Sequence, residues 1–225
     1  MFSEARELLI ISHFHVSIPP ENKLSLTHTR TQVRVFKNDH RADVEKVMLH
    51  PNGYYLASGT CSGVVHVWDV RTCDLKSQHL AQARSCLGPV NAIAFSTNGR
   101  LMAVAGEDTD ILIWDFAYMK FPVAVLKGHE ANVNSLEFSE GNSDILASGS
   151  SDCTVKIWDV SKWNGRTTPG RTRAKGEDRI DSNVDTTSSC LLLSLPTKRT
   201  PVHGLRFSPE NLLLAAGMFT PTKLL

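Results

Sequence analysis

The sequence lacks the motifs by which most enzyme classes are recognised. It contains no glycine-rich phosphate-binding loop, no His-Glu-x-x-His zinc motif and no Gly-x-Ser-x-Gly nucleophile turn. It also lacks any run that approaches the roughly 20 apolar residues of a membrane-spanning helix. We therefore expect a soluble protein that is not an enzyme, carries no cofactor and has neither a small-molecule nor a membrane partner.

Paired cysteines and a secretion signal are absent as well. The chain has five cysteines, an odd number, and none of them lies in a Cys-x-x-Cys pair. The scattered histidines near the N-terminus have no cysteine at metal-ligand spacing. Glu4 and Glu7 precede a very short apolar run at residues 8–11, whereas a signal peptide needs a basic start and a longer apolar core. These features predict reduced thiols in an intracellular protein without a metal.

An excess of charge of one sign is also missing. The net charge is +1, and aromatic residues make up 7% of the chain. These aromatic residues stand at apolar positions of alternating segments and not beside basic residues. The sequence therefore gives no support for direct binding of nucleic acid.

The most informative pattern that is present runs from residue 126 to residue 160. Gly128-His129 opens it, Trp158-Asp159 closes it, and two short alternating apolar segments lie between them. This pattern resembles a WD repeat, which forms one four-stranded blade of a β-propeller. The resemblance implies an all-β fold.

Four residues of this repeat predict a buried hydrogen-bonded chain. An imidazole can donate and accept, a carboxylate accepts, and an indole N–H donates. If one buried member of such a chain is left unpaired, the cost is about 1–3 kcal/mol, so the four residues depend on one another. The predicted structural tetrad consists of His129, Ser148, Asp152 and Trp158. A Ser, a His and an Asp also make up a catalytic triad, but their spacing from Trp158 assigns these three to blade structure.

Two earlier repeats carry only part of this tetrad. The repeat at residues 39–69 keeps three members and has Ser62 where Asp152 is expected. The repeat at residues 88–115 has Cys86 at the histidine position and Val104 at the serine position. The partial tetrads are His40, Ser58 and Trp68 in the former, and Asp108 and Trp114 in the latter. Trp68, Trp114 and Trp158 follow one another at intervals of 46 and 44 residues, close to the length of a propeller blade.

The repeats suggest two regions of the chain. Residues 1–31 match no pattern and are predicted to be irregular, while residues 32–225 are predicted to form a partial propeller. Residues 31–36 alternate as the outermost strand of a blade whose earlier part is missing. Residues 161–189 are rich in Arg, Thr, Gly, Ser and Asp and predict a flexible insertion. After it, residues 191–195 predict a closing strand, and residues 200–217 predict the first two strands of a further repeat.

This count predicts three to four blades of a larger, seven-bladed propeller. Closure normally removes exposed strand edges from a propeller, so an open arc of blades leaves edges unpaired. We expect the chain to be a fragment or truncated product of a longer protein.

Beyond the generic repeat, residues 33–225 resemble one family, that of the WD-repeat subunit of the general transcription factor TFIID, its subunit five. The resemblance is carried by the segments His50-Pro-Asn-Gly-Tyr-Tyr-Leu-Ala-Ser-Gly59 and Gly88-Pro-Val90, and by a last repeat without Trp-Asp after a long insertion. That last repeat reads Thr200-Pro-Val-His-Gly-Leu-Arg-Phe207, followed by Asn211-Leu-Leu-Leu-Ala-Ala-Gly217. The resemblance implies a nuclear scaffold that docks histone-fold subunits in TFIID or in a related histone-acetylating coactivator, and so acts in RNA polymerase II transcription initiation. The N-terminal helical region of that family is not matched here.

Partner contacts are expected where blades expose their loops on one rim. Residues just before a first strand and in the turn before a third strand are exposed there. The candidates are Asp43, Glu107, Asn132 and Ser151. Two alternatives stay open: a WD-repeat substrate adaptor, for example of a ubiquitin ligase, and a truncated product without function.

Overall fold

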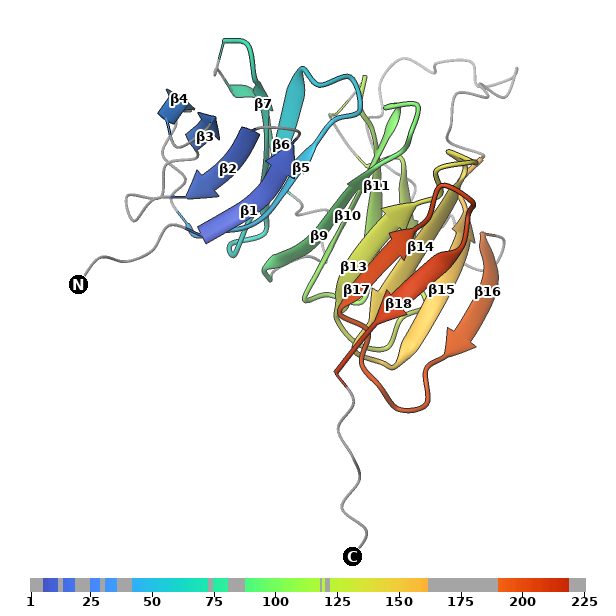
Figure 1. Ribbon diagram of the computed structural model, residues 1–225. Coiled ribbons are helices and arrows are strands. Elements are labelled where there is room, and N and C mark those ends of the chain that lie inside the picture. The colour runs from blue at the N-terminus through green and yellow to red at the C-terminus, as the bar shows by residue number, and fades with distance from the viewer. Residues whose placement is uncertain are drawn as a thin grey trace, which may run out of the picture.

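The computed structural model describes residues 6–11, 14–18, 25–28, 31–35, 42–72, 75–80, 88–117, 119, 122–161 and 190–218. All regular structure in these ranges is β-strand, and none of it is helix, so no described helix is long and apolar enough to cross a membrane. The strands form four four-stranded antiparallel sheets and one two-stranded sheet (Figure 1). The prediction of a partial β-propeller is confirmed.

Each sheet is a meander in which consecutive strands pair, and we call the four-stranded sheets blades 1 to 4. Blade 1 contains β1 (Arg6–Ile11), β2 (Phe14–Ile18), β3 (Ser25–His28) and β4 (Thr31–Val35). Blade 2 contains β5 (Val44–Leu49), β6 (Tyr55–Thr60), β7 (Val64–Asp69) and β8 (Leu75–Leu80).

The remaining strands follow the same order. Blade 3 contains β9 (Val90–Phe95), β10 (Leu101–Gly106), β11 (Ile111–Asp115) and β12 (Ala124–Leu126). Blade 4 contains β13 (Val133–Phe138), β14 (Ile145–Ser150), β15 (Thr154–Asp159) and β16 (Leu191–Pro196). The two-stranded sheet, which we call the half-blade, contains β17 (Gly204–Phe207) and β18 (Leu213–Ala216).

The first strands of successive sheets lie side by side, β1 next to β5, then β9, β13 and β17. The sheets therefore fan out from a common axis, as Figure 1 shows for the green, yellow and red strands. Because the strands are antiparallel, the start of the first strand lies beside the end of the second strand, and we call this side of the blades the rim.

Neighbouring blades pack face to face through apolar side chains. Because side chains alternate between the faces of a strand, each blade contributes one row to each neighbour. Blade 2 packs on blade 3 through Ala57, Val65, Val67, Val90, Ile93, Met102, Val104, Leu112 and Trp114. Blade 3 packs on blade 4 through Ala103, Ala105, Ile111, Ile113, Leu126, Leu136, Leu146 and Trp158. Among the residues whose side chains the structure describes, these two interfaces form the main core.

Two glycines of the second strands allow the next blade to approach closely. A Cβ atom on Gly59 would lie 2.5 Å from Cγ1 of Val90, and one on Gly149 would lie 2.4 Å from Cγ1 of Val202. Contacts this short do not occur between real carbon atoms, so a side chain at either position would force the two sheets apart. The Ser-Gly pairs of β6 and β14 thus serve both the network inside the blade and the packing between blades.

The structure corrects the expectation for the N-terminal segment. Residues 1–31 were expected to be irregular, but β1, β2 and β3 lie there and pair with β4. Strand β4 is the edge strand of its sheet, as residues 31–36 predict, and the earlier part of its blade is present as β1–β3. These strands are short and lack Gly-His and Trp-Asp boundaries, so the repeat pattern does not mark them.

Other boundaries agree with the structure. The closing strand predicted at residues 191–195 is β16, and the further repeat predicted at residues 200–217 is the half-blade. The predicted insertion at residues 161–189 lies outside the described residues, apart from Ser161.

Candidate interaction site

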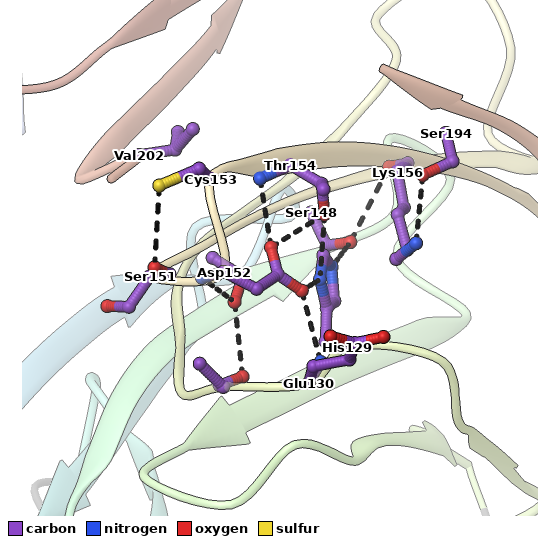
Figure 2. Close-up of polar contacts among 12 residues, drawn as sticks. His129, Glu130, Ser148, Ser151, Asp152, Cys153, Thr154, Lys156, Ser194 and Val202 are labelled. Carbon is purple, nitrogen blue, oxygen red and sulfur yellow. Dashed lines mark hydrogen bonds and ion pairs between the residues drawn. The ribbon is translucent and has the colours of Figure 1, made fainter. Parts of the chain in front are cut away.

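Blade 4 brings its four predicted network residues together, and Figure 2 shows three of them, His129, Ser148 and Asp152. His129 lies in the loop before β13, Ser148 lies on β14, Asp152 lies in the turn that follows β14, and Trp158 lies on β15. Although they are up to 29 positions apart in the sequence, antiparallel pairing of β14 with β13 and β15 places them in one row across the blade.

The hydrogen bonds of this network have a defined direction. Nε1 of Trp158 donates to Oγ of Ser148 at 2.8 Å, and the same Oγ lies 2.7 Å from Nε2 of His129. Because the carboxylate of Asp152 can only accept, Nδ1 of the neutral imidazole donates to it, and Nε2 is left to accept a hydrogen bond from the Ser148 hydroxyl. The proton of the neutral imidazole is therefore assigned to Nδ1, which donates to Oδ2 of Asp152 at 2.7 Å.

Burial and charge maintain these protonation states. Burial lowers the pKa of His129 below its ordinary value of 6.5, although the hydrogen bond to Asp152 acts in the opposite direction. Burial alone would raise the pKa of Asp152, but hydrogen bonds from Thr154, His129 and the backbone of Glu130 outweigh it and hold that pKa at about 2. At neutral pH the network thus contains a neutral imidazole and a carboxylate.

Thr154 is a fifth member that sequence reasoning missed. Its Oγ1 donates to Oδ1 of Asp152 at 2.6 Å, and its backbone N–H donates to the same oxygen at 2.9 Å. The backbone N–H of Glu130 donates to Oδ2 of Asp152 at 3.1 Å. The available signal was the spacing Asp152-x-Thr154, which is typical of a side chain that caps its own turn. Asp152 is therefore saturated with donors and is not available to a ligand.

Blades 2 and 3 differ from blade 4 in the same place. In blade 2, Nε1 of Trp68 donates to Oγ of Ser58 at 2.8 Å, which reproduces the indole end of the network. His40, the predicted third member, lies outside the described residues. In blade 3, Asp108 accepts from the backbone N–H of Thr109 at 2.7 Å, and Val104 provides no hydroxyl for Trp114.

The four predicted partner contacts lie on one rim, next to the ends of the network. One backbone hydrogen bond recurs there in blades 2, 3 and 4 and joins the turn before the third strand to the residue before the first strand. In blade 4, the N–H of Ser151 donates to the carbonyl of Asn132 at 3.0 Å. The equivalent pairs are Cys61 with Asp43 at 2.8 Å and Glu107 with Pro89 at 3.1 Å. The rim is thus a repeated arrangement with a different side chain at each place.

These rim side chains differ in accessibility. Asp43 and Glu107 are exposed, whereas Asn132 and Ser151 are half-buried. Oγ of Ser151 accepts a hydrogen bond from Nδ2 of Asn134 at 2.9 Å, and the same amide group also donates to the carbonyl of Val202 at 2.9 Å. Asn134 therefore ties blade 4 to the half-blade and occupies part of the hydrogen-bonding capacity of Ser151. Asp43 and Glu107 are the stronger contact candidates.

The chemistry of the described residues gives no metal-binding cluster. They contain no group of three or more His, Cys, Asp or Glu side chains placed to hold an ion. Within the same ranges Cys61, Cys153 and Cys190 are free thiols. The network of blade 4 has catalytic residue types, but each of its polar atoms is directed to another member of the blade.

Comparison with known proteins gives a family match and several relatives. Residues 30–69, 80–115 and 120–159 match the family model described as "WD domain, G-beta repeat", and together these ranges make up more than half of the chain. The first match begins just before β4 and ends with β7, and the third ends with β15. One sequence repeat therefore contains the last strand of one blade and the first three strands of the next.

Three relatives illustrate the range of similar proteins. The pre-mRNA-splicing factor cwf17 of Schizosaccharomyces pombe is 32% identical over 120 residues, 53% of this chain and 34% of the relative. Pre-mRNA-processing factor 19 of Oryza sativa is 32% identical over 117 residues, 51% of this chain and 21% of the relative. Transcription initiation factor TFIID subunit 5 of Caenorhabditis elegans is 28% identical over 193 residues, 83% of this chain and 27% of the relative. The chain thus spans about a fifth to a third of the length of these relatives.

Proposed function

Because the chain belongs to the WD-domain, G-beta repeat family, whose members are in general non-enzymatic scaffolds that mediate protein–protein interaction, we propose that it is a docking scaffold of the transcription initiation machinery. In this proposal it binds histone-fold subunits in the nucleus, in TFIID or in a related coactivator. The observation that carries the proposal is the rim of blades 2 to 4, where one backbone arrangement presents different side chains in turn.

The geometry of the rim supports a binding role and not a catalytic one. The polar atoms of blade 4 that resemble a catalytic triad are already hydrogen-bonded within the blade. Asp152 accepts from several donors, and Oγ of Ser148 is hydrogen-bonded to both Trp158 and His129. Asp43 and Glu107 are exposed on the rim. Their charge favours a partner with a basic surface.

The extent of the similarity to known proteins supports the proposed role in transcription. The similarity to TFIID subunit 5 extends over 83% of this chain, whereas the two splicing proteins match about half of it. The longer match favours a role close to that of the transcription subunit. Histone-fold subunits are the partners that the resemblance of residues 33–225 to this family implies.

A pull-down from nuclear extract tests the proposal. The bait is the intact chain, and the rim variant carries Asp43→Lys and Glu107→Lys. A matched control carries Glu140→Lys and Glu210→Lys, which make the same change of charge at exposed positions in turns between first and second strands. Mass spectrometry identifies the bound proteins, and circular dichroism verifies that both variants are folded.

We expect histone-fold transcription subunits with the wild-type chain and the control, and their loss with the rim variant. A hot-spot residue contributes about 2 kcal/mol or more to binding, which is sufficient to remove a partner from a pull-down. Equal recovery by both variants would place the contact elsewhere. Recovery of cullin-type ligase components in place of transcription subunits would replace the proposal by a ligase adaptor.

A further inference from the structure

Blades 2, 3 and 4 also share a backbone arrangement on the side opposite the rim. The carbonyl of the residue before the second strand accepts from the N–H of the residue after the third strand, in the pairs Tyr54 with Val70, Arg100 with Phe116 and Asp144 with Val160. The third strand ends in an aspartate whose Oδ1 accepts from the N–H two positions later, at 2.8 to 2.9 Å in each blade. The fold therefore builds one frame three times.

Two side-chain positions of this frame differ from blade to blade. Blade 2 has Tyr54 and Arg71, whereas the equivalent residues are Arg100 and Ala117 in blade 3, and Asp144 and Ser161 in blade 4. Since the same frame forms with all three pairs, the fold does not require an aromatic ring and a guanidinium in blade 2. Blade 2 also lies between blades 1 and 3, so this surface is not at an end of the described fan of blades.

Tyr54 and Arg71 are exposed, yet both are held in place. In Arg71, Nε donates to Oδ1 of Asp69 at 3.2 Å, Nη2 donates to Oδ2 at 2.8 Å, and Cζ lies 4.9 Å from the centroid of the Tyr54 ring. Tyr54 is 51% exposed, and the side chain of Arg71 is 61% exposed. Side chains that are already fixed lose little conformational entropy when a partner binds, and Tyr and Arg are common among hot-spot residues.

Arg71 keeps part of its hydrogen-bonding capacity in a defined geometry. A guanidinium has five N–H donors, and Asp69 accepts from Nε and from one N–H of Nη2. Among the residues that the structure describes, only Asp69 is hydrogen-bonded to this guanidinium. The outer edge, made by Nη1 and the second N–H of Nη2, therefore has the fork geometry that binds a further carboxylate in bidentate fashion.

The neighbouring blade adds a second cation on the same side. Arg100 is exposed at the position that corresponds to Tyr54, whereas Asp69 and Asp115, the aspartates of the two frames, are half-buried. The charged groups that blades 2 and 3 present outward from these positions are thus two guanidinium groups. On the rim of the same blades, Asp43 and Glu107 present the opposite charge.

We propose that the side of blades 2 and 3 opposite the rim is a second docking surface, which binds an acidic segment of a partner protein. One carboxylate of the segment accepts from the outer edge of Arg71, an adjacent aromatic or apolar side chain packs on the Tyr54 ring, and a second carboxylate pairs with Arg100. The partner is a peptide and not a nucleic-acid strand, because Asp69 and Asp115 belong to the same frames and repel a run of phosphates. The two sides of these blades then select partners of opposite charge, and the chain can join two proteins.

Peptide selection on the intact 225-residue chain tests this proposal. A phage library of random dodecapeptides is first cleared on a variant that carries Tyr54→Asp and Arg71→Ser, and is then selected on the wild-type chain. This double variant gives blade 2 the residue pair that blade 4 carries in the same frame, so we expect it to fold. Selected peptides are labelled with fluorescein, and their binding is measured by fluorescence anisotropy.

Two further variants locate the contact. Arg71→Lys keeps the charge and removes the fork. Lys198→Asn combined with Arg199→Asn is the matched control, because it lowers the net charge by two, as the Tyr54/Arg71 variant does. Both control residues are exposed in the turn after β16, on the rim side, where the N–H of Thr197 donates to the carbonyl of Cys153 at 2.8 Å. Thermal unfolding verifies that all variants are folded.

We expect the selected peptides to carry Asp or Glu beside an aromatic or large apolar residue. Their affinity should fall at least about tenfold in the Tyr54/Arg71 variant and at least about threefold in Arg71→Lys, and should stay within about twofold in the control.

Four outcomes would overturn the proposal. They are a selection that yields no peptide after clearing, selected peptides without carboxylates, equal binding to the wild type and the Tyr54/Arg71 variant, and equal weakening by the control variant. A labelled oligothymidylate that binds the wild-type chain and not the Tyr54/Arg71 variant would also overturn it, because the surface would then bind single-stranded nucleic acid.

Discussion

Blade 4 and blade 3 share their strand order, yet a polar chain crosses blade 4 where apolar side chains fill blade 3. In blade 4, Ser148 connects Trp158 to His129. In blade 3, the equivalent Val104 lies in an apolar cluster with Ile93 and Leu112. The polar chain is therefore not required to build a blade in this protein.

The difference predicts how the stability of each blade responds to substitutions. An apolar position loses stability in proportion to the contacts that are removed, whereas a buried polar network loses more than one contact when a single member is replaced. The network also fixes the rim, because Asp152 and His129 hold the turn and the loop that flank Ser151 and Asn132. Replacements in blade 4 are therefore expected to act together, and those in blade 3 to act alone.

The largest effect is expected for His129→Ala. This change removes the acceptor of the Ser148 hydroxyl and one donor of Asp152, so two buried groups lose partners. The free energy of unfolding should fall by about 3 kcal/mol. Urea unfolding followed by tryptophan fluorescence measures it. The control His203→Ala replaces an exposed histidine of the half-blade and should change stability by less than about 0.5 kcal/mol. A loss below about 1 kcal/mol for His129→Ala would contradict the network described above.

The next largest effect is expected for Ser148→Ala, at about 2 kcal/mol, because the indole N–H of Trp158 loses its acceptor. In the His129→Ala background the same change should cost at least about 1 kcal/mol less, since part of the network is already lost. Val104→Ala, at the equivalent position of blade 3, makes a matched comparison. Combined with Ser148→Ala, its effect should add within about 0.5 kcal/mol, because the two sites lie in different blades. If the free energies of unfolding deviated from additivity equally in the Ser148→Ala/His129→Ala and Ser148→Ala/Val104→Ala variants, the proposed difference between the two blades would be wrong.

A smaller effect is expected for Thr154→Val, which keeps the shape and deletes the hydroxyl that donates to Asp152 at 2.6 Å. The backbone donors of Asp152 remain, so the loss should be about 1 kcal/mol. Thermal unfolding at pH 7.5 measures it. No measurable loss would indicate that water replaces the hydroxyl at this half-buried site.

Much of the fold could be predicted from sequence because the repeat signals are local. Turn residues, alternating apolar positions and Trp-Asp ends mark blades 2, 3 and 4, and they also gave the tetrad of blade 4. Blade 1 was missed because its strands lack these signals, and so was Thr154, whose role depends on the geometry of a turn.

Other features were not accessible to sequence reasoning because they join distant segments. Nζ of Lys156 donates to Oγ of Ser194 at 2.9 Å, and the two residues are separated by the predicted insertion. The exposure of Leu193 and Leu195 on β16 was likewise hidden, since these residues have the alternating pattern of any buried strand. Their exposure depends on how many strands the next sheet contributes.

The smallest effect in this comparison is a pH dependence that belongs to blade 4. Burial lowers the pKa of His129 in the folded protein below the ordinary 6.5, so the unfolded chain binds more protons as the pH falls through 6.5. The stabilisation is complete above that pH and is lost progressively below it. A single group binds at most one proton, so the loss between pH 7 and pH 6 should stay below about 1 kcal/mol. Urea unfolding at a series of pH values measures the slope.

The variant His129→Ala isolates this contribution from those of other groups. His66 in blade 2 is also buried with a lowered pKa, so the wild-type slope contains both histidines. The difference between wild type and His129→Ala should therefore shrink as the pH falls from 7 to 5, because protonation weakens the same network that the substitution removes. Asp152 enters only at more acidic pH, since its pKa of about 2 lies below the ordinary 3.8 and its stabilisation is lost between these two values. A difference that stays constant from pH 7 to pH 5 would mean that His129 binds its proton equally well in the folded and unfolded chain, and that burial does not keep the imidazole neutral.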